Sequence, residues 1–420
     1  MAITFFTDAL LGNDNAGGSS EGSPKASGVD AVVTSANQTI DLSGDSPDLS
    51  AAVSGDTIRL NGFTDGVRST DIFEITSIND GADTVDVVQT PGSSISGVTW
   101  AIGGAFKTIQ RVMNTIFAGD KGWIKASAPY EENVNQIVLG TVASPIIIEG
   151  YASITGDQGV VINDGTSNPG NGWLTPNNNI YCVYKYLRMT NFTLRGWRGV
   201  GTDYAKFIEC RFDNNGNDGI YLGSVCTLLG CYAHNNTNSG FVLSSNDAHV
   251  LSCISVNNGL DGFQVNKKIV LYNCLSVSNG RYGVYSTFND QQTFMNCTID
   301  GNNQTTEIGM YFINETKGRI VCINNIVVGC VSGMVANTDT KENTVSMNNL
   351  LFNNTVNYSK IQTFFGEVLA NPLFINPSGL DYSLSNASPA LNAGFDLAMN
   401  PWIETLGSQI NIGALQKISE

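Results

Sequence analysis

The chain has 420 residues, a formal net charge of −16, 14% charged residues and 45 glycines. So little charge with so much glycine favours short strands joined by tight turns over a helical protein. The acidic balance argues against nucleic acid and membrane surfaces as partners, because phosphate binding requires a basic surface. The sequence has no apolar stretch of about 18 residues that could span a membrane. Its start, MAITFFTDALLGNDN, lacks a secretory-signal pattern, so we expect assembly in a cytoplasm.

The N-terminal quarter divides into three expected segments. Residues 1–28 hold a strand at Ile3–Phe6 and a loop. Residues 29–102 contain short alternating strands with DG and GD turns, which predict a small β-barrel or sandwich inserted before the main fold. Residues 103–122 predict an amphipathic helix that caps the main fold. Its apolar side chains at helical spacing are Phe106, Ile109, Val112, Met113 and Ile116.

A short repeat dominates the middle of the chain. Five cysteines recur at steps of 21, 22, 21 and 23 residues: Cys210, Cys231, Cys253, Cys274 and Cys297. A fixed period of this length is typical of a solenoid in which each repeat forms one coil. Residues 123–384 are therefore predicted to form an all-β, right-handed parallel β-helix, closed by a capping tail over residues 385–420.

Asparagine and glycine mark the corners of the predicted coils. Four residues after the first four of these cysteines comes a polar corner residue: Asn214, Asn235, Asn257 or Ser278. A second asparagine follows directly. Asparagine tolerates left-handed backbone geometry, and stacked amides can bond one another along the coils. A glycine and an apolar residue come next, which predicts that Phe241 and Phe263 stack in the core.

The cysteine positions also predict the first strand of each coil. Residues two before each cysteine share its parity, so Leu229 and Leu251 are expected to face the interior with the cysteines. The chain has nine cysteines, an odd number, and no C-x-x-C pair, which argues against disulfides and zinc. We interpret the column as small buried hydrophobes, with redox or metal chemistry as the alternative. We expect no cofactor and no metal.

Candidate catalytic residues lie eight positions after two of the repeating cysteines. Asp218 and Asp261 fall two coils apart, roughly 9.6 Å by strand spacing. That separation is near the upper limit for the carboxylate pair of an inverting glycosidase. Arg281 lies nearby in the stack. The alternative is that all three are solvated turn residues beside the glycine corners.

Tyrosines share one exterior position on the second strand of several coils. Tyr221, Tyr285 and Tyr311 occupy this column. A row of tyrosines can stack on sugar rings or contact a neighbouring subunit. Ordinary cross-strand stacking on an exposed sheet is the alternative.

Two adjacent coils place four aliphatic side chains outward, directly after their cysteines. These are Ile254, Val256, Leu275 and Val277. Exposed apolar patches usually indicate a covering loop or a partner. We therefore expect this apolar strip to be covered, by an adjacent subunit or by a segment of this chain.

Three stretches resemble known families. The run from Phe106 to Tyr151, with AFKTIQRVMN, GDKGWIKA and SPIIIEGY, resembles the entrance of pectate-lyase-like right-handed β-helix proteins. The stretch NPLFINPSGLDYSLSNASPALNAGFD, followed by INIGALQ, is similar to the tail that closes many of them. The insert ending GVTWAIGG is similar to a segment of bacteriophage virion proteins with the same β-helix. The resemblance implies the fold, which serves lyases, hydrolases, adhesins and virion proteins alike.

Our leading hypothesis is a bacteriophage virion structural protein: a capsid decoration, spike or fibre component, with glycan binding as a further role. Its expected partners are other virion proteins, like subunits in a homo-oligomer, and a host surface glycan. The alternative is a polysaccharide lyase or glycoside hydrolase acting on cell-surface glycan, and a third class is a bacterial adhesin. Lyases of this fold use carboxylates that bind calcium and an Arg or Lys base. No adjacent coils here stack three carboxylates, so no calcium cluster is predicted.

Overall fold

A computed structural model describes most of the chain. The described residues are 4–14, 16–35, 37–63, 71–176, 180–201, 204–223, 225–244, 247–287, 290–302, 307–313, 318–337, 344–363, 365–395 and 411–414. The chain divides into two compact units. The first comprises residues 1–168 and 172–188, and the second comprises residues 169–171 and 189–420. In the described part, no helix is long and apolar enough to cross a membrane.

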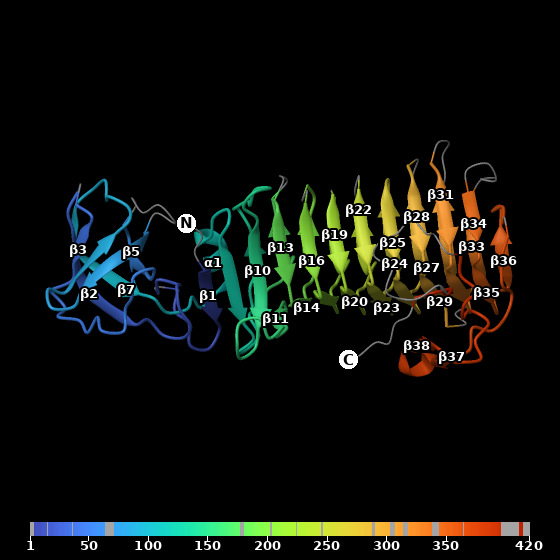
Figure 1. Cartoon of the computed structure of the whole chain (residues 1–420), viewed down its shortest axis with the longest axis horizontal. Helices are drawn as coiled ribbons and strands as arrows, with labels where there is room; N and C mark the ends of the chain where they lie inside the picture. Colours follow the sequence, from blue (N-terminus) through green and yellow to red (C-terminus); the bar gives the residue numbers. More distant parts are fainter. Residues whose placement is uncertain are drawn as a thin grey trace. The chain divides into compact units, whose positions relative to one another are not determined.

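The first unit contains a closed antiparallel barrel, coloured blue in Figure 1. Its strands follow the order β2-β3-β6-β5-β4-β7. Their bounds are β2 (Ala26–Val33), β3 (Thr39–Asp41), β4 (Thr57–Leu60), β5 (Ile72–Asn79), β6 (Thr84–Val87) and β7 (Ile95–Ile102). Alternating residues such as Phe73, Val85 and Trp100 fill its interior. The expected barrel or sandwich is therefore a barrel, closed by pairing of β2 with β7.

The first unit also holds the entrance to the β-helix. Strand β1 (Thr4–Asp8) pairs in parallel with β8 (Lys121–Lys125), followed in the sheet by β10 (Ile146–Tyr151) and β13 (Cys182–Lys185). Further strands of this unit are β9 (Val134–Asn135), β11 (Val161–Asp164) and β12 (Trp173–Thr175), and β14 (Leu187–Thr190) crosses the boundary between the units.

A short cap helix, α1 (Ile109–Thr115), precedes β8. Thr108 begins it, because its side chain accepts a hydrogen bond from the Arg111 N–H, and Ile116 ends it in an extended conformation. The helix is therefore much shorter than the span 103–122 expected to contain it. Its apolar face is buried, including Val112 and Met113.

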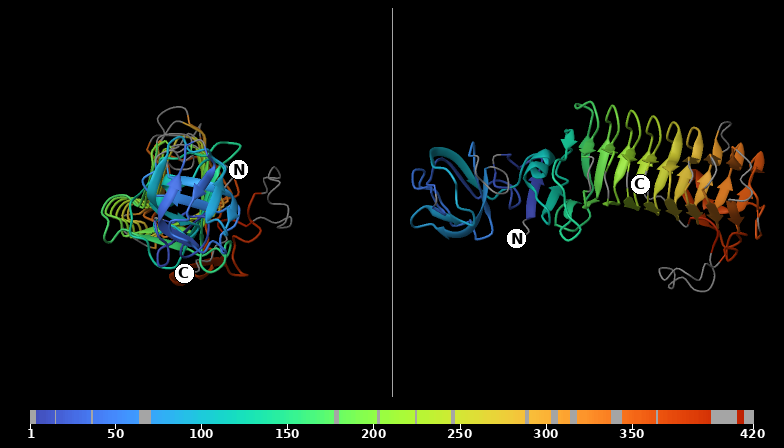
Figure 2. Two further views of the ribbon diagram at one scale, coloured as in Figure 1. Left: turned by 90° about the vertical axis from the view of Figure 1, so that its left-hand side faces the viewer. Right: turned by 90° about the horizontal axis from the view of Figure 1, so that it is seen from above.

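The second unit is a parallel β-helix with three sheets, whose successive coils lie side by side in Figures 1 and 2. The first sheet contains β16 (Ala205–Ile208), β19 (Cys226–Leu229), β22 (Ala248–Leu251), β25 (Ile269–Tyr272), β28 (Gln292–Met295), β31 (Ile320–Ile323) and β34 (Thr344–Met347). The second contains β17 (Arg211–Asp213), β20 (Tyr232–His234), β23 (Ile254–Val256), β26 (Leu275–Val277), β29 (Thr298–Asp300), β32 (Ile326–Val328) and β35 (Leu350–Phe352). The third contains β15 (Trp197–Gly199), β18 (Ile220–Leu222), β21 (Phe241–Leu243), β24 (Asp261–Asn266), β27 (Tyr282–Thr287), β30 (Ile308–Ile313), β33 (Ser332–Ala336) and β36 (Val356–Ser359). The predicted fold is confirmed.

Asparagines bond along the coils at the corner after the second sheet. The corner residues Asn214, Asn235, Asn257 and Ser278 have φ values of 55°, 54°, 54° and 54°. The residues that follow them form the predicted ladder, with Nδ2–Oδ1 distances of 2.9, 2.9 and 3.0 Å along Asn215, Asn236, Asn258 and Asn279. Glycine is needed at the next corner because the backbones approach closely. A Cβ on Gly219 would lie 2.6 Å from the Gly240 carbonyl oxygen.

The core prediction is right for the third sheet and wrong for the first. Phe241 and Phe263 are buried and stack with ring centroids 5.0 Å apart. Leu229 is 41% exposed, however, and Leu251 is only partly buried. One residue with positive φ lies between each of these leucines and its cysteine, for example Ser252 at 52°. This residue breaks the strand alternation, so the leucine and the cysteine no longer point to the same side. All nine cysteines are free and buried.

The C-terminal segment folds back as a hairpin of β37 (Phe374–Asn376) and β38 (Asp381–Leu384), joined through the 3₁₀ turn η1 (Pro377–Gly379). Figure 1 shows this hairpin in red. Further along, Ile412 packs with Ile326 and Leu350 of the second sheet. The described part of the tail therefore covers the second sheet of its own β-helix.

Candidate functional site

An outward column of the third sheet contains the predicted tyrosines. Tyr221, on β18, is separated by Val242 and Gln264 from Tyr285 on β27, which pairs in register with Tyr311 on β30. All three tyrosines are partly exposed. The structure thus brings Tyr285 and Tyr311 together and places Tyr221 further along the same face.

Tyr282 joins this pair, although sequence reasoning did not single it out as a site residue. Its ring centroid lies 5.1 Å from that of Tyr285 and 4.9 Å from that of Tyr311, and all three rings are stacked. The ring faces are therefore largely occupied by one another, as the cross-strand stacking alternative anticipated. What remains for a ligand is a row of ring edges and phenol groups.

Arg281 and Asp261 form an ion pair with two hydrogen bonds beside these rings. Arg281 Nε lies 2.9 Å from Asp261 Oδ1, and Nη2 lies 2.7 Å from Oδ2. The guanidinium carbon also lies 4.8 Å from the ring centroid of Tyr282 and 5.0 Å from that of Tyr285, within cation–π range. Burial raises the pKa of Asp261 despite the Arg281 bonds, and the hydrogen bond to Asp261 raises the pKa of Arg281.

A second pair repeats this arrangement near Tyr221. Arg195 Nε lies 2.8 Å from Asp218 Oδ2, and its guanidinium carbon is 4.9 Å from the Tyr221 ring centroid. Sequence reasoning missed Arg195. It occupies the Asp218 column one coil earlier, just before a corner glycine, so extending the repeat upstream could have found it. We name the eight side chains of both groups the Arg–Tyr strip: Arg195, Asp218, Tyr221, Asp261, Arg281, Tyr282, Tyr285 and Tyr311.

The two candidate catalytic carboxylates are not solvated turn residues. Asp218 is 6% exposed and Asp261 is fully buried, because an arginine covers each. An inverting pair needs one carboxyl to donate a proton and the other to activate water. Here both carboxylates instead accept hydrogen bonds from guanidinium groups. Among the described residues, no group of three His, Cys, Asp or Glu side chains could hold a metal ion.

The apolar strip is covered by the tail of this chain. Val256, Leu275 and Val277 are buried in one cluster with Tyr382, and Phe374 and Leu380 pack against it. Ile254 is a partly buried member. Of the two expected covers, the structure shows the segment of this chain, so the strip gives no support for an adjacent subunit.

Comparisons with known proteins agree with this architecture. Residues 198–365 match the family model of the right handed beta helix region. The crystal structure of pectate lyase Pel9A is similar, with a TM-score of 0.55 and 15% sequence identity. The match covers 75% of this chain and 92% of the lyase chain. At this identity the likeness shows the fold alone. The chain is thus a right-handed parallel β-helix protein.

Two phage proteins are also similar, more weakly. The tailspike protein gp49 from Pseudomonas phage LKA1 has a TM-score of 0.17 and 13% identity, covering 88% of this chain and 69% of that one. The tailspike gp61 of Pseudomonas phage phi297 has a TM-score of 0.18 and 10% identity, covering 88% and 68%. Scores this low carry no argument about function. No curated protein sequence matches the chain.

Proposed function

We propose that the chain is a structural, glycan-binding component of a bacteriophage particle. In this proposal the Arg–Tyr strip contacts a glycan on the host surface, and the N-terminal barrel attaches the chain to another particle protein. The observation that carries the proposal is the strip itself. It consists of two groups of partly exposed tyrosines on the third sheet, each beside an arginine.

The chemistry of the strip suits a neutral sugar chain. Tyrosine hydroxyls can donate to and accept from sugar hydroxyls, and sugar sites combine aromatic surface with a few placed polar groups. Arg281 uses Nε and Nη2 for Asp261, which leaves Nη1 to donate to a ligand. Because each arginine is paired with an aspartate, the strip carries little net charge and has no preference for an anionic sugar.

The paired carboxylates favour binding over catalysis. A lyase or hydrolase needs a free base or a proton donor beside the substrate. At the strip, Asp218 and Asp261 are each held by an arginine, so neither is poised for this work. The carbohydrate-enzyme alternative therefore has no specific support from the strip.

The barrel has features suited to attachment. It is tied to the cap helix through Asp71, whose carboxylate lies 2.7 Å from Arg59 of β4 and 3.1 Å from Arg111 of α1. Several aliphatic side chains on it are exposed, including Val29 at 65% and Val53 at 55%. Exposed apolar groups on a firmly held domain suit a docking role, as does the similarity of the insert to segments of virion proteins.

Binding by the strip can be tested with the double variant Tyr285→Ala/Tyr311→Ala. Against a panel of bacterial surface oligosaccharides, the variant should lose at least about tenfold in affinity, since it removes two of the clustered rings. Tyr204→Ala, which removes an exposed tyrosine outside the strip, is the matched control. Release of unsaturated or reducing sugars by the wild-type chain would instead move the enzyme alternative ahead.

Attachment by the barrel is tested by a deletion that joins Gly28 to Gly103. The new junction is short, because Gly28 pairs with Trp100 across β2 and β7. The deletion should carry Arg111→Gln, since it removes the Asp71 partner of a mostly buried arginine. We expect the β-helix to fold and the chain to be absent from particles. Unchanged incorporation would refute the attachment role.

A further inference from the structure

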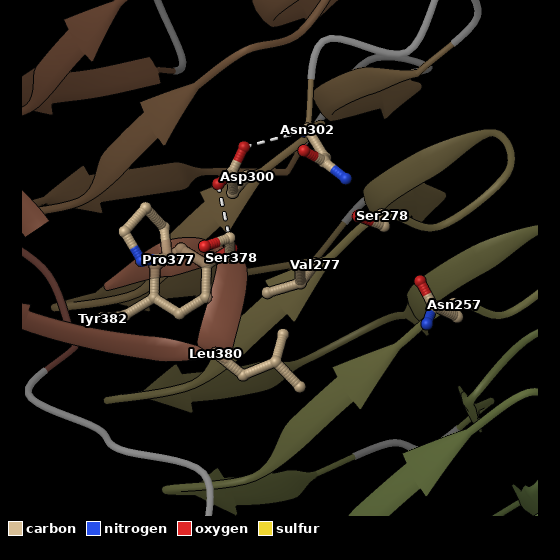
Figure 3. Close-up of a pocket in the computed structure, with 9 residues that line it drawn as sticks. All are labelled: Asn257, Val277, Ser278, Asp300, Asn302, Pro377, Ser378, Leu380 and Tyr382. Atoms are coloured by element: carbon tan, nitrogen blue, oxygen red, sulfur yellow. Dashed lines mark hydrogen bonds between the residues drawn. The ribbon is translucent and has the colours of Figure 1, made fainter. Parts of the chain in front are cut away.

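A pocket of about 510 Å³ opens beside the tail hairpin, on the second sheet rather than the third. Figure 3 shows the side chains that line it. The β-helix contributes Asn257, Val277, Ser278, Asp300 and Asn302, and the hairpin contributes Pro377, Ser378, Leu380 and Tyr382. Volumes of this size accommodate small organic ligands.

The β-helix wall presents corner residues from neighbouring coils. Asn257 and Ser278 each have a φ of 54°, in the left-handed region. The asparagines that follow them point inward and bond in the ladder. The corner side chains therefore face outward, where Asn257 is exposed with its amide available, and the largely buried Val277 lines the pocket beside them.

A hydrogen bond between Asp300 and Tyr382 links the β-helix wall of the pocket to the hairpin wall. Asp300 Oδ2 accepts a hydrogen bond from the Tyr382 hydroxyl at 2.9 Å, and Oδ1 accepts one from the Asn302 N–H at 2.7 Å. Each carboxylate oxygen has a second lone pair for a ligand hydroxyl. This carboxylate is thus oriented before any ligand arrives, which lowers the ordering cost of binding.

The hairpin wall is also held in place. Asn376 accepts hydrogen bonds from the Gly379 N–H at 3.2 Å and the Ser378 hydroxyl at 3.0 Å, which fixes the tight turn. The turn sets Pro377 and Ser378 at the pocket, and the Tyr382 side chain is 1% exposed. One wall is therefore mainly rigid and apolar, while the other carries amide, hydroxyl and carboxylate groups.

We infer that this pocket binds a neutral pyranose residue, through hydroxyl contacts to Asp300 and Asn257 and through packing on the hairpin turn. None of the nine lining residues is a lysine, arginine or histidine, so an anionic ligand has no counter-charge there. A single carboxylate does not make a metal site. A sugar ring matches the combination of an apolar wall and several hydroxyl partners. The ligand class is that of the proposed function, but the site is separate from the Arg–Tyr strip.

The test uses the full chain and ligand-observed NMR with the methyl glycosides of glucose, galactose, mannose and N-acetylglucosamine at millimolar concentration. At least one glycoside should bind. Asn257→Ala should weaken that binding by roughly tenfold through lost hydrogen bonds. Ser378→Trp should abolish it by filling the pocket. Asn235→Ala is the matched control, because Asn235 occupies the same corner one coil earlier and does not line the pocket.

The strip variant Tyr285→Ala/Tyr311→Ala separates this inference from the proposed function. If the pocket variants lose glycoside binding and the strip variant retains it, the pocket site stands on its own. If only the strip variant loses binding, the pocket inference is overturned and the proposed function remains. If no glycoside in the panel binds, or if Asn257→Ala and Ser378→Trp behave like Asn235→Ala, the pocket is not a sugar site.

Discussion

Two outer faces of the same β-helix differ in burial: one is covered by the C-terminal hairpin and the other is partly exposed. On the second sheet, aliphatic side chains such as Val256 and Val277 are 2% and 3% exposed, because the C-terminal hairpin packs on them. On the third sheet, arginines and tyrosines stay partly exposed, with their charges paired and their rings stacked. The contrast teaches that outward aliphatic residues in a solenoid can be covered by a segment of the same chain, whereas the outward aromatic and polar row stays partly exposed, and there we propose that a ligand binds.

The largest loss of stability should come from placing charged side chains beneath the C-terminal hairpin. In Val256→Lys/Val277→Lys, two ammonium groups would be placed within the apolar contact with Leu380 and Tyr382, and the hairpin should detach. We expect a loss of about 3–5 kcal/mol of folding free energy in urea denaturation, with faster proteolysis of the tail. Gln264→Lys on the third sheet should change stability by no more than about 0.5 kcal/mol. A tail that stays protected in the double variant would break the comparison.

The next effect concerns Glu307, at the corner between β29 and β30. In the described structure its two carboxyl oxygens are buried, and burial raises its pKa to about 9. The folded chain thus holds this proton to higher pH than the unfolded chain does, so stability should fall as pH rises from about 4.5 to about 9. Glu307→Gln should flatten this decline, adding up to about 5 kcal/mol near pH 8 and nothing near pH 4. Parallel pH dependence of wild type and variant in thermal melts would contradict the assignment.

A smaller effect is expected at the third-sheet ion pair. Arg281→Ala leaves the buried Asp261 carboxylate without its partner, and we expect a cost of about 2–3 kcal/mol. Adding Asp261→Asn should recover part of it, because the buried charge disappears. Chemical denaturation of the two single variants and the double variant gives the coupling energy. A coupling energy near zero would mean that the two side chains do not stabilise one another.

The smallest effect should come from Tyr382→Phe. The variant keeps the aromatic ring at position 382 that packs on the apolar strip, and it removes only the hydrogen bond to Asp300. We expect a loss of about 1 kcal/mol in urea denaturation, with the tail still protected from protease. Tail release by this variant would show that the polar contact, rather than apolar burial, holds the hairpin.

The contacts that recur once in every coil could be predicted from the sequence. The asparagine ladder and the Phe241–Phe263 stack recur at fixed positions, so their neighbours in space follow from their neighbours in the repeat. The exposure of Leu229 was missed because parity holds only along a continuous strand. A left-handed residue between the strand and the cysteine breaks it.

The candidate site was less accessible to sequence reasoning, because one of its ion pairs joins residues in different columns. Arg281 lies one position before the Asp261 column and reaches back one coil to pair with Asp261. The cover of the apolar strip comes from Leu380 and Tyr382, more than a hundred residues later in the chain. No periodicity encodes a contact of this kind, so the sequence indicated that the strip is covered without identifying the cover.

The asparagine ladder also bears on how such a chain can change length. Along the ladder, each amide bonds to the amides of the coil before and the coil after, as Asn236 does with Asn215 and Asn258. A duplicated coil would therefore bring its own rung, and the amides on either side would find the same partners as before. Lengthening by whole coils would preserve every register, whereas an insertion of a few residues within a corner would interrupt the line of amides. The ladder thus makes the coil, rather than the residue, the unit in which this molecule can grow or shrink by duplication and deletion.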